Sequence, residues 1–524
     1  MTRRLKIGVL DLVAKEPGGG LYSRVMDANL ASIMPQVVSV WCEEAGHQVH
    51  YICYTGREDL LAELPKDLDV LFIGAFTEAA LLSYALSNLF RQRGAVTVLG
   101  GPHARCYPED ARKYFDYVLG FTDRQTVAEV LSECAPHRPY GRHLFAAQQP
   151  RELVPLAARW KFVAATLAKA PTVKFVPMIG SLGCPYTCSF CIDSTVDYQP
   201  LSFQQLGEDL QFLLTKIKRP IVGWHDPNFG VRFDDYMEAI ERAVPDGQIR
   251  HIAESSLSLL SEPHLKRLRK NGFQAALPGI ESWFGLGNKS KTRRIGMEKV
   301  QQIAEHVNLV LRYIPYVQTN FVLGLDSDEG PEPFELTKVF LDLVPGAFPA
   351  YSLLSAFGRA APSNLDYQRE GRLLPFPFHF LNNNHAMNVR PKNYTWPDFY
   401  DHLIDLSRYS FSWKAIGRRF MATPAAIPRY MNVVRAISSE GFGRIKYHTK
   451  IRQLLDTDPE IQAYFAQQTD KLPAFYLARI KRELGPMYEM LPEGSLVHDP
   501  YAYLASEAQA TLTPMGPPAR VAAM

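Results

Sequence analysis

Three cysteines form the densest group of reactive side chains in this sequence. Cys184, Cys188 and Cys191 lie within eight residues, spaced C-x3-C-x2-C, directly after an apolar run from Val173 to Ile179 that predicts a strand. A [4Fe–4S] cluster is normally held by four Cys thiolates, so three leave one iron without a protein ligand. An open metal position is where chemistry on a substrate or cofactor can occur. A structural zinc site and a disulfide are the alternatives, but zinc needs a fourth ligand from a second short-spaced pair, and the other cysteines offer none.

The cysteine spacing resembles that of the radical S-adenosylmethionine (SAM) superfamily, whose members usually carry an aromatic residue before the third cysteine, as Phe190 is here. The resemblance implies that Cys184, Cys188 and Cys191 hold a [4Fe–4S] cluster. It also implies that the open iron chelates the amino and carboxylate groups of SAM. An electron from the cluster would then cleave SAM to methionine and a 5′-deoxyadenosyl radical, which abstracts hydrogen from the substrate.

Length and composition bound the remaining possibilities. A chain of 524 residues is long enough for two or three domains, and 47% hydrophobic with 21% charged residues is ordinary for a globular protein. The net charge of +3 without a long basic run gives no indication of nucleic-acid binding. The sequence contains no apolar stretch of the ~18–20 residues that a membrane span needs. The remaining cysteines are scattered, which favours a reducing cytoplasm, as does an oxygen-sensitive cluster.

Residues 1–140 alternate apolar runs with helix-like segments, which predicts a doubly wound α/β domain with a parallel sheet. Such domains bind ligands at the carboxyl ends of their strands, where the strand order reverses. The predicted strands are Lys6–Leu12, His47–Tyr54, Val70–Ala75, Val96–Gly100 and, last, Tyr117–Gly120, and the predicted helices are Ala28–Ala45, Asp59–Leu64, Glu78–Arg93, Pro108–Tyr114 and Thr126–Cys134.

The stretch Val98-Leu99-Gly100-Gly101-Pro102-His103-Ala104 looks like the Gly-Gly-Pro-His loop of cobalamin-binding domains fused ahead of radical SAM barrels. The resemblance extends to Ala45–Val49 and to the Thr77 loop. It implies cobalamin contacts from loop residues at the strand ends, namely Thr77, Gly100, Gly101, His103 and Gly120.

Two departures from this resemblance matter. The Asp-x-His-x-x-Gly motif that supplies an axial histidine to cobalt is absent, and Phe121 stands where Gly120 is usually followed by Glu. The alternative is a domain that keeps the fold without the cofactor, since fold alone does not determine function. His103 is either a ligand or a loop histidine hydrogen-bonded to backbone.

Residues 141–172 are interpreted as a linker with one helix at Arg159–Ala168, and residues 173–385 as a partial (β/α)6 barrel. Barrel active sites lie at the carboxyl ends of the strands, and the Cys loop directly follows the first of them. The predicted strands are Val173–Ile179, Ile221–His225, Arg250–Ala253, Ala275–Ile280, Val317–Leu325 and Ala350–Ala356, with helices at Phe203–Lys216, Phe233–Ala243, Glu262–Asn271, Met297–Leu311 and Phe334–Leu343.

Polar and glycine residues follow several of these strands and match the superfamily's SAM-binding segments. Asp226 could accept hydrogen bonds from the SAM ammonium group; its alternative role is a helix cap in a turn. Glu254, at the end of the third strand, is expected at a polar contact or at a solvated strand end. By the same resemblance the SAM site comprises Phe190, Asp226, Asn228, Glu254, Gly279, Glu281, Asn320 and Gly324.

Two further features concern the segment after the fourth strand. Trp283 replaces the glycine of the family's Gly-Ile-Glu-Ser-Gly segment, and it would either narrow the pocket or serve as a core aromatic. The family's Asn-Lys pair is matched by Asn288 and Lys289.

Residues 386–510 are predicted to be helical and rich in aromatic residues. They form either a helical core or a lid that closes the barrel, and residues 511–524 are expected to be a disordered tail. The predicted helices are Trp396–Tyr409, Trp413–Phe420, Tyr430–Ser439, Phe442–Leu454, Pro459–Gln468 and Ala474–Glu483.

Taken together, the resemblance implies a cobalamin-dependent radical SAM methyltransferase. One SAM would methylate cob(I)alamin, a second would yield the radical, and methyl would pass to an unactivated carbon of a small-molecule or natural-product substrate. A flavodoxin or ferredoxin would donate electrons. The alternatives are a radical SAM enzyme that cyclises or oxidises its substrate without cobalamin, and a non-catalytic electron-transfer or scaffold protein that carries the cluster.

Overall fold

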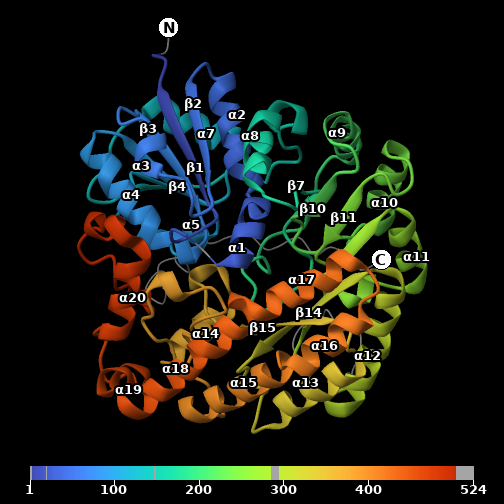
Figure 1. Ribbon diagram of the computed structural model, residues 1–524. Coiled ribbons are helices and arrows are strands. Elements are labelled where there is room, and N and C mark those ends of the chain that lie inside the picture. Colours follow the sequence, from blue (N-terminus) through green and yellow to red (C-terminus); the bar gives the residue numbers. More distant parts are fainter. Residues whose placement is uncertain (1–2, 19, 147–148, 285–293, 503–524) are drawn as a thin grey trace.

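The structure is a computed structural model that describes residues 3–18, 20–146, 149–284 and 294–502. Figure 1 shows three regions: a first α/β unit in blue at the upper left, a second set of strands in green and yellow at the right and centre, and C-terminal helices in orange and red along the bottom and left. In the part of the chain described, no helix is both long and apolar enough to cross a membrane.

The first region is a parallel sheet of order β2-β1-β3-β4-β5-β6. The chain moves from β1 to β2 on one side and then returns to β3 on the other, so the order reverses between β1 and β3. The strands are β1 (Lys6–Leu12), β2 (Gln48–Tyr54), β3 (Val70–Ala75), β4 (Val96–Gly100), β5 (Tyr117–Leu119) and β6 (Arg142–Leu144). The helices are α1 (Leu21–Met26), α2 (Ile33–Glu44), α3 (Leu60–Glu63), α4 (Ala80–Gln92), α5 (Pro102–Cys106), α6 (Pro108–Ala111) and α7 (Arg124–Glu133).

This sheet confirms the predicted doubly wound fold, with two corrections. Residues 117–120 do not form the last strand, because β6, in the predicted linker, pairs parallel to β5. A short helix, α5, directly follows the Gly-Gly pair. The sequence did not predict either element because each is too short to show a periodic apolar pattern.

The second region confirms the predicted series of six parallel strands. They run in sequence order, with β14 next to β15 at one end. The predicted fourth strand is two strands, β12 and β13, which pair with successive parts of β14. The strands are β7 (Phe175–Met178), β10 (Ile221–Trp224), β11 (Arg250–Ala253), β12 (Phe273–Ala276), β13 (Gly279–Glu281), β14 (Tyr316–Leu323) and β15 (Phe348–Leu353). Their helices are α9 (Phe203–Lys216), α10 (Phe233–Ala243), α11 (Glu262–Lys270), α12 (Gly296–Tyr313) and α13 (Glu332–Leu343).

The C-terminal helices pack into one aromatic core with the barrel and the first sheet. Phe399, Tyr400 and Phe411 are buried, as the aromatic pattern predicts, but Trp413 is 70% exposed. The helices are α14 (Ser363–Arg369), α15 (Trp396–Ser410), α16 (Trp413–Ala422), α17 (Ala426–Ile437), α18 (Arg444–Thr457), α19 (Pro459–Phe465) and α20 (Ala474–Leu484). The predicted tail, residues 511–524, lies outside the described residues.

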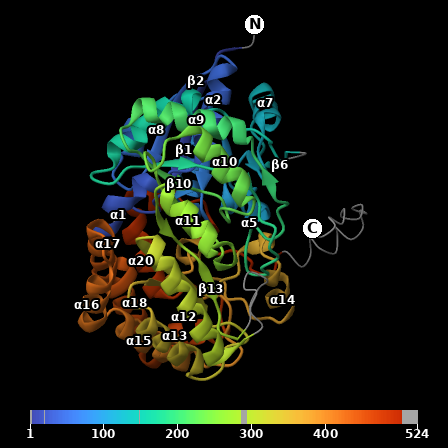
Figure 2. The same cartoon turned by 90° about the vertical axis from the view of Figure 1, so that its right-hand side faces the viewer.

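The three regions pack against one another through several helices. Helix α8 (Leu156–Lys169), in the predicted linker, packs on α2 of the first region and on α9 of the barrel. The last described turns, at Gly485–Met490, pack on α4, and Asn88 donates to the Met490 carbonyl. Figure 2, turned by 90°, shows the first sheet behind helices α9 and α10 of the barrel. The carboxyl edges of both sheets are therefore fixed relative to each other.

Candidate functional site

The Cys loop is closed at its base by a short antiparallel pair of strands. Strands β8 (Ser181–Leu182) and β9 (Gln199–Pro200) pair directly after β7, and residues 183–198 form the loop between them. Gly183 has φ +69°, and a Cβ there would lie 2.3 Å from the Asp197 carbonyl oxygen. Only glycine accommodates that turn, so it aims the following residues inward.

The loop carries all three predicted cluster ligands. Cys184 and Cys188 are buried and Cys191 is half-buried, and none of the chain's cysteines forms a disulfide. The Cys191 amide donates to the Cys188 carbonyl (2.9 Å), and Cys184 donates to Val196 (3.3 Å). A compact loop that presents three thiols at the carboxyl end of the first barrel strand fits a cluster with three protein ligands.

The first region contacts this loop through Arg105 of α5. Its guanidinium donates to Asp193 Oδ1 (3.1 Å from each terminal nitrogen) and to the Ile192 carbonyl (2.8 Å). The Asp193 amide in turn donates to Cys191 Sγ (3.5 Å). Arg105, which follows the Gly-Gly-Pro-His stretch, therefore binds Asp193, and the Asp193 amide donates to the candidate cluster ligand Cys191. Such contacts orient metal ligands and tune an iron–sulfur centre.

Asp226 lies at the end of β10 but is used within the protein. Its carboxylate accepts hydrogen bonds from the Gly180 amide (3.1 Å), the Ser181 hydroxyl (2.7 Å) and the Tyr236 hydroxyl. The side chain is 2% exposed, and burial raises its pKa. These bonds show that Asp226 holds the entry to the Cys loop, and its contact with the SAM ammonium group stays a prediction.

Asn228, Glu254 and Phe190 remain near the predicted positions at the mouth of the barrel. Asn228 Oδ1 accepts from the Ser256 amide (2.8 Å), while its buried Nδ2 lacks a hydrogen-bond acceptor. Glu254 is exposed at the end of β11, and its carbonyl accepts from Phe229. Phe190 is half-buried against the core. An orphaned buried amide is costly, so Asn228 Nδ2 is the strand-end donor best suited to an acceptor group of a ligand.

Two glycines of the predicted site have packing roles. A Cβ on Gly279 would lie 2.1 Å from Glu281 Oε1, so this glycine makes room for the folded-back Glu281 carboxylate. Gly324 has φ +85°, its amide donates to Asp328 Oδ2 (3.1 Å), and a Cβ would come within 2.8 Å of Met387 Cε. The glycine at the end of β14 is thus packed against the C-terminal region.

Asn320 and Trp283 both stabilise the broken fourth strand. Asn320 Nδ2 donates to the Leu277 carbonyl (3.2 Å), and the Asn320 amide donates to the Pro278 carbonyl (3.1 Å). Trp283 is 2% exposed and donates from Nε1 to Thr337 Oγ1 (2.9 Å). Trp283 is therefore a core aromatic and does not narrow a pocket. Asn288 and Lys289 lie outside the described residues.

The carboxyl edge of the first sheet is shaped by glycines. Around Gly100, at the end of β4, no atom lies within 4 Å of where a Cβ would be. Gly101 has φ +90°, and a Cβ there would be 3.0 Å from Ala75 backbone atoms. Thr77 is buried and hydrogen-bonds to Cys106. Gly100 thus leaves room for a ligand, whereas Gly101 and Thr77 serve the packing of α5.

His103 and Gly120 are covered by other side chains. His103 is fully buried, its Nε2 is hydrogen-bonded to the Tyr84 hydroxyl (2.7 Å), and burial lowers its pKa to about 3. The described partner of His103 is thus the Tyr84 side chain and not the backbone, and a contact of His103 with cobalamin stays a prediction. A Cβ on Gly120 would lie 2.1 Å from the ring of Phe145, which follows β6. Phe145 covers this strand end.

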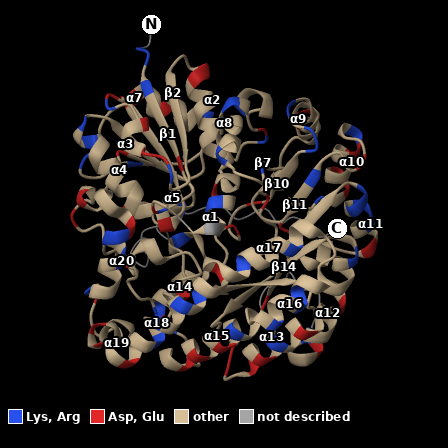
Figure 3. Ribbon diagram, viewed as in Figure 1, with Lys and Arg blue, Asp and Glu red and all other residues tan. Residues whose placement is uncertain are grey.

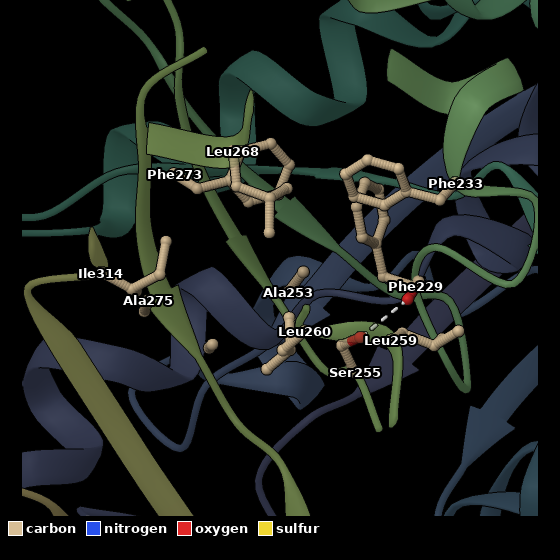
Figure 4. A pocket seen from close by; sticks show the side chains of 11 residues that line it. Phe229, Phe233, Ala253, Ser255, Leu259, Leu260, Leu268, Phe273, Ala275 and Ile314 are labelled. Atoms are coloured by element: carbon tan, nitrogen blue, oxygen red, sulfur yellow. Dashed lines mark hydrogen bonds between the residues drawn. The ribbon is translucent and has the colours of Figure 1, made fainter. Parts of the chain in front are cut away.

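A small cavity lies elsewhere, between the barrel strands and helices α10 and α11 (Figure 4). Its volume is about 10 Å³, and its walls are mainly apolar, with Phe229, Phe233, Leu268 and Phe273 pointing into it. This is about the space of one water molecule. It is a packing gap and cannot hold SAM.

Sequence reasoning missed Arg105, Tyr236 and Phe145. Arg105 stands two residues after His103 in the very loop that carried the resemblance, but its partner Asp193 is 88 residues away. Tyr236 reads as an apolar helix residue, and only the fold brings its hydroxyl to Asp226. No local signal in the sequence identifies such pairs.

Comparisons with known proteins agree with this geometry. No family model matches the chain. Bacteriochlorophyllide d C-12(1)-methyltransferase of Chlorobaculum tepidum is 23% identical over 373 residues, which cover 69% of this chain and 79% of that protein. The C-8(2)-methyltransferase of the same organism is 25% identical over 228 residues, covering 41% and 50% of the two chains.

Two solved structures share the fold. The radical SAM methyltransferase TsrM from Kitasatospora setae, with tryptophan and a SAM analogue bound, is 14% identical, with 75% of this chain and 80% of that chain covered and a TM-score of 0.51. The cobalamin-dependent radical SAM enzyme OxsB, with aqua-cobalamin and SAM bound, is 13% identical, with 98% and 80% covered and a TM-score of 0.52.

These findings confirm the resemblance that the cysteine motif and the Gly-Gly-Pro-His loop carry. The chain shares its fold with TsrM and OxsB, two radical SAM enzymes. It also aligns with one methyltransferase, at 23% identity, over 69% of its length.

Proposed function

We propose that this protein is a cobalamin-dependent radical SAM methyltransferase. The observation that carries the proposal is the contact between Arg105 and the Cys loop. It joins the carboxyl edge of the first sheet to the carboxyl edge of the barrel at the three thiols. Two cofactors bound at these two edges would face one shared space, as transfer between them requires.

In this proposal Cys184, Cys188 and Cys191 hold a [4Fe–4S] cluster, SAM binds at the barrel strand ends, and cobalamin binds over Gly100. When bound, these groups supply reductive cleavage of SAM and delivery of its methyl group. The chain's own residues bind, orient and exclude water, because the cofactors carry the chemistry. Asn228 offers a buried donor, and Asp226 and Asn320 hold the loops in place.

The substrate in this proposal is a small molecule with an unactivated carbon as methyl acceptor. The named activities of the Chlorobaculum tepidum relatives and the tryptophan bound to TsrM support this class. A flavodoxin or ferredoxin would supply electrons in a reducing cytoplasm. The division into a cobalamin-type domain (1–140), a linker (141–172), a barrel (173–385) and a helical region (386–510) is part of the same proposal.

A second outcome with the same cofactors is an oxidative or ring-forming reaction. OxsB, which is matched over 98% of this chain, is named as a cobalamin-dependent SAM radical enzyme and not as a methyltransferase, so its likeness fits either outcome. A non-catalytic cluster carrier is the remaining alternative, and it predicts that SAM is not cleaved.

The decisive experiment is anaerobic reconstitution with iron, sulfide and cobalamin, followed by SAM and dithionite. We expect an iron–sulfur absorbance, a cobalamin spectrum that stays with the protein through gel filtration, and 5′-deoxyadenosine. Absence of 5′-deoxyadenosine from the fully loaded protein would reject catalysis. With a substrate found by mass, a product heavier by one CH2 unit, because methyl replaces hydrogen, supports methylation, and a product lighter by two hydrogens supports the second outcome.

A further inference from the structure

Helices α16 and α17 carry large apolar side chains on the protein surface. Trp413 is 70% exposed, Met421 77%, Ile427 61% and Tyr430 64%, and Ile437 at the end of α17 is also exposed. These five side chains are called the hairpin face below. They lie within one short helix-turn-helix stretch of the sequence, whereas single exposed apolar residues scattered over a surface need no explanation.

The apolar residues follow one outward stripe on each helix. On α16, Trp413, Gly417 and Met421 recur every four residues and are all exposed. On α17, Ile427, Tyr430 and Ile437 follow helical spacing. The opposite faces, with Ile416 and Arg419 on α16 and Asn432, Arg435 and Ala436 on α17, are buried. Both helices therefore have an apolar face that is exposed on the surface of the described chain.

The two stripes belong to one surface. Helices α16 and α17 pack against each other, and the ring of Phe420 lies 5.9 Å from that of Tyr430. The Trp413 ring lies 5.5 Å from Phe442. Both helices lie at the front of the molecule in Figure 1 and form its left edge in Figure 2, where nothing covers them.

Helices α16 and α17 themselves carry charges of one sign. Residues 411–439 contain no Asp or Glu but have Lys414, Arg418, Arg419, Arg429 and Arg435. Arg419 and Arg435 are buried, Lys414 is exposed, and Arg418 and Arg429 are partly exposed. In Figure 3 these helices carry blue segments only, and the red segments lie on neighbours such as α13 and α15. Lys414 and Arg429 thus form a basic rim beside the apolar stripes, whereas Arg418 is paired with Asp342 of α13.

We propose that the hairpin face docks on an anionic lipid surface. Helices that lie in a membrane interface combine apolar residues, often Trp and Tyr, with a Lys- and Arg-rich polar side. Each basic residue near such a surface contributes attraction of its own. A second copy of the chain fits this face less well, because a two-fold symmetric contact would place the basic residues of the two copies next to each other. Docking of this kind needs no spanning helix.

The test is flotation of the full chain with vesicles made of equal parts phosphatidylcholine and phosphatidylglycerol, and with pure phosphatidylcholine vesicles. We expect binding to the anionic vesicles that weakens with added salt. The double variant Trp413→Ser/Tyr430→Ser should lower partitioning about tenfold or more because it removes interfacial aromatic area. Lys414→Glu should lower it about fivefold or more.

A matched control is Tyr140→Ser/Val497→Ser, which removes two apolar side chains exposed to 57% and 46% elsewhere on the surface. It should bind vesicles like the unmodified chain, and thermal melting should show that all variants are folded. No flotation with anionic vesicles would overturn the proposal, as would equal flotation of the double variant. Sedimentation that shows a dimer, dissociated by Trp413→Ser/Tyr430→Ser, would instead assign the face to a second copy.

Discussion

The two parallel sheets present very different carboxyl edges. At the barrel edge, polar side chains such as Asp226 and Asn320 form hydrogen bonds to neighbouring loops. At the edge of the first sheet, glycines dominate, and Gly100 has open space where a side chain would be. Hydrogen bonds from side chains therefore hold the loops at the barrel edge. At the edge of the first sheet, the missing side chain of Gly100 leaves open space. A cluster loop needs rigid anchoring, whereas a large planar cofactor needs clearance.

Removing a candidate cluster ligand should have the largest effect on the barrel edge. We expect Cys188→Ala to reduce the iron–sulfur absorbance and SAM cleavage to background after reconstitution, since two thiolates cannot retain the cluster. Cys134→Ala, which changes a cysteine outside the loop, should leave both at normal levels. A Cys188→Ala protein with a complete, SAM-cleaving cluster would contradict the assignment.

The next largest effect should come from Asp226, the residue that anchors the Cys loop. Asp226→Ala leaves three buried donors unsatisfied and should lower the stability of the folded protein by about 3 kcal/mol, measured as a shift in thermal melting. Asp226→Asn keeps an acceptor and should lose about half as much.

The same pair of variants separates anchoring from SAM binding. If Asp226 only positions the loop, Asp226→Asn should bind SAM within about threefold of the normal affinity, a difference of less than 1 kcal/mol. A stable Asp226→Asn protein whose SAM affinity falls far more would show that the carboxylate binds the cofactor.

The junction between the two edges can be weakened at Arg105. Arg105→Ala should lower SAM cleavage about tenfold and shift the reduction potential of the cluster, because Asp193 would lose its anchor next to Cys191. Arg105→Lys keeps the charge without the fork geometry and should give an intermediate result. If Arg105→Ala leaves the reduction potential and SAM cleavage unchanged, the contact between Arg105 and Asp193 has no part in the proposed function.

The glycine pair tests the first edge by itself. Gly101→Ala places a side chain at φ +90° against Ala75 and should cost about 1–3 kcal/mol of stability. Gly100→Leu meets open space, so it should change stability by less than about 0.5 kcal/mol. It should nevertheless weaken cobalamin binding about tenfold, a loss of about 1.4 kcal/mol, as measured by absorbance titration. Normal binding by Gly100→Leu would place the cofactor elsewhere.

His103 should have the smallest effect. It is fully buried on Tyr84 and neutral, because burial lowers its pKa to about 3. His103→Gln should cost about 1 kcal/mol and leave the absorption and paramagnetic spectra of bound cobalamin unchanged. A changed cobalt spectrum in this variant would show that His103 reaches the metal.

Much of the architecture was predictable from local patterns. β1, β3, β4 and β11 begin and end where the apolar runs predict, and so do α9 and α10. The longer of these elements, such as β1, α9 and α10, carry apolar patterns bounded by turn residues, which makes them the easiest to place. β6 and α5 were missed because they are short.

The site was less predictable than the fold. The family's motifs led to the correct strand ends, but not to what each side chain does there. Asp226 and Asn320 bond within the protein, and His103 is buried in the core, because partners far away in sequence occupy their polar atoms. Trp413 reads like its buried aromatic neighbours and is exposed.

The sequence by itself determined the three-thiol loop, the glycines before α5 and the order of strands and helices. These follow from residue type and short-range spacing, which act within a few positions of the chain. Only the tertiary structure decided which polar groups remain available to a ligand and which apolar faces stay uncovered. Those outcomes depend on partners distant in sequence, such as Ser181 for Asp226 and Asp193 for Arg105, that come together only in the folded chain.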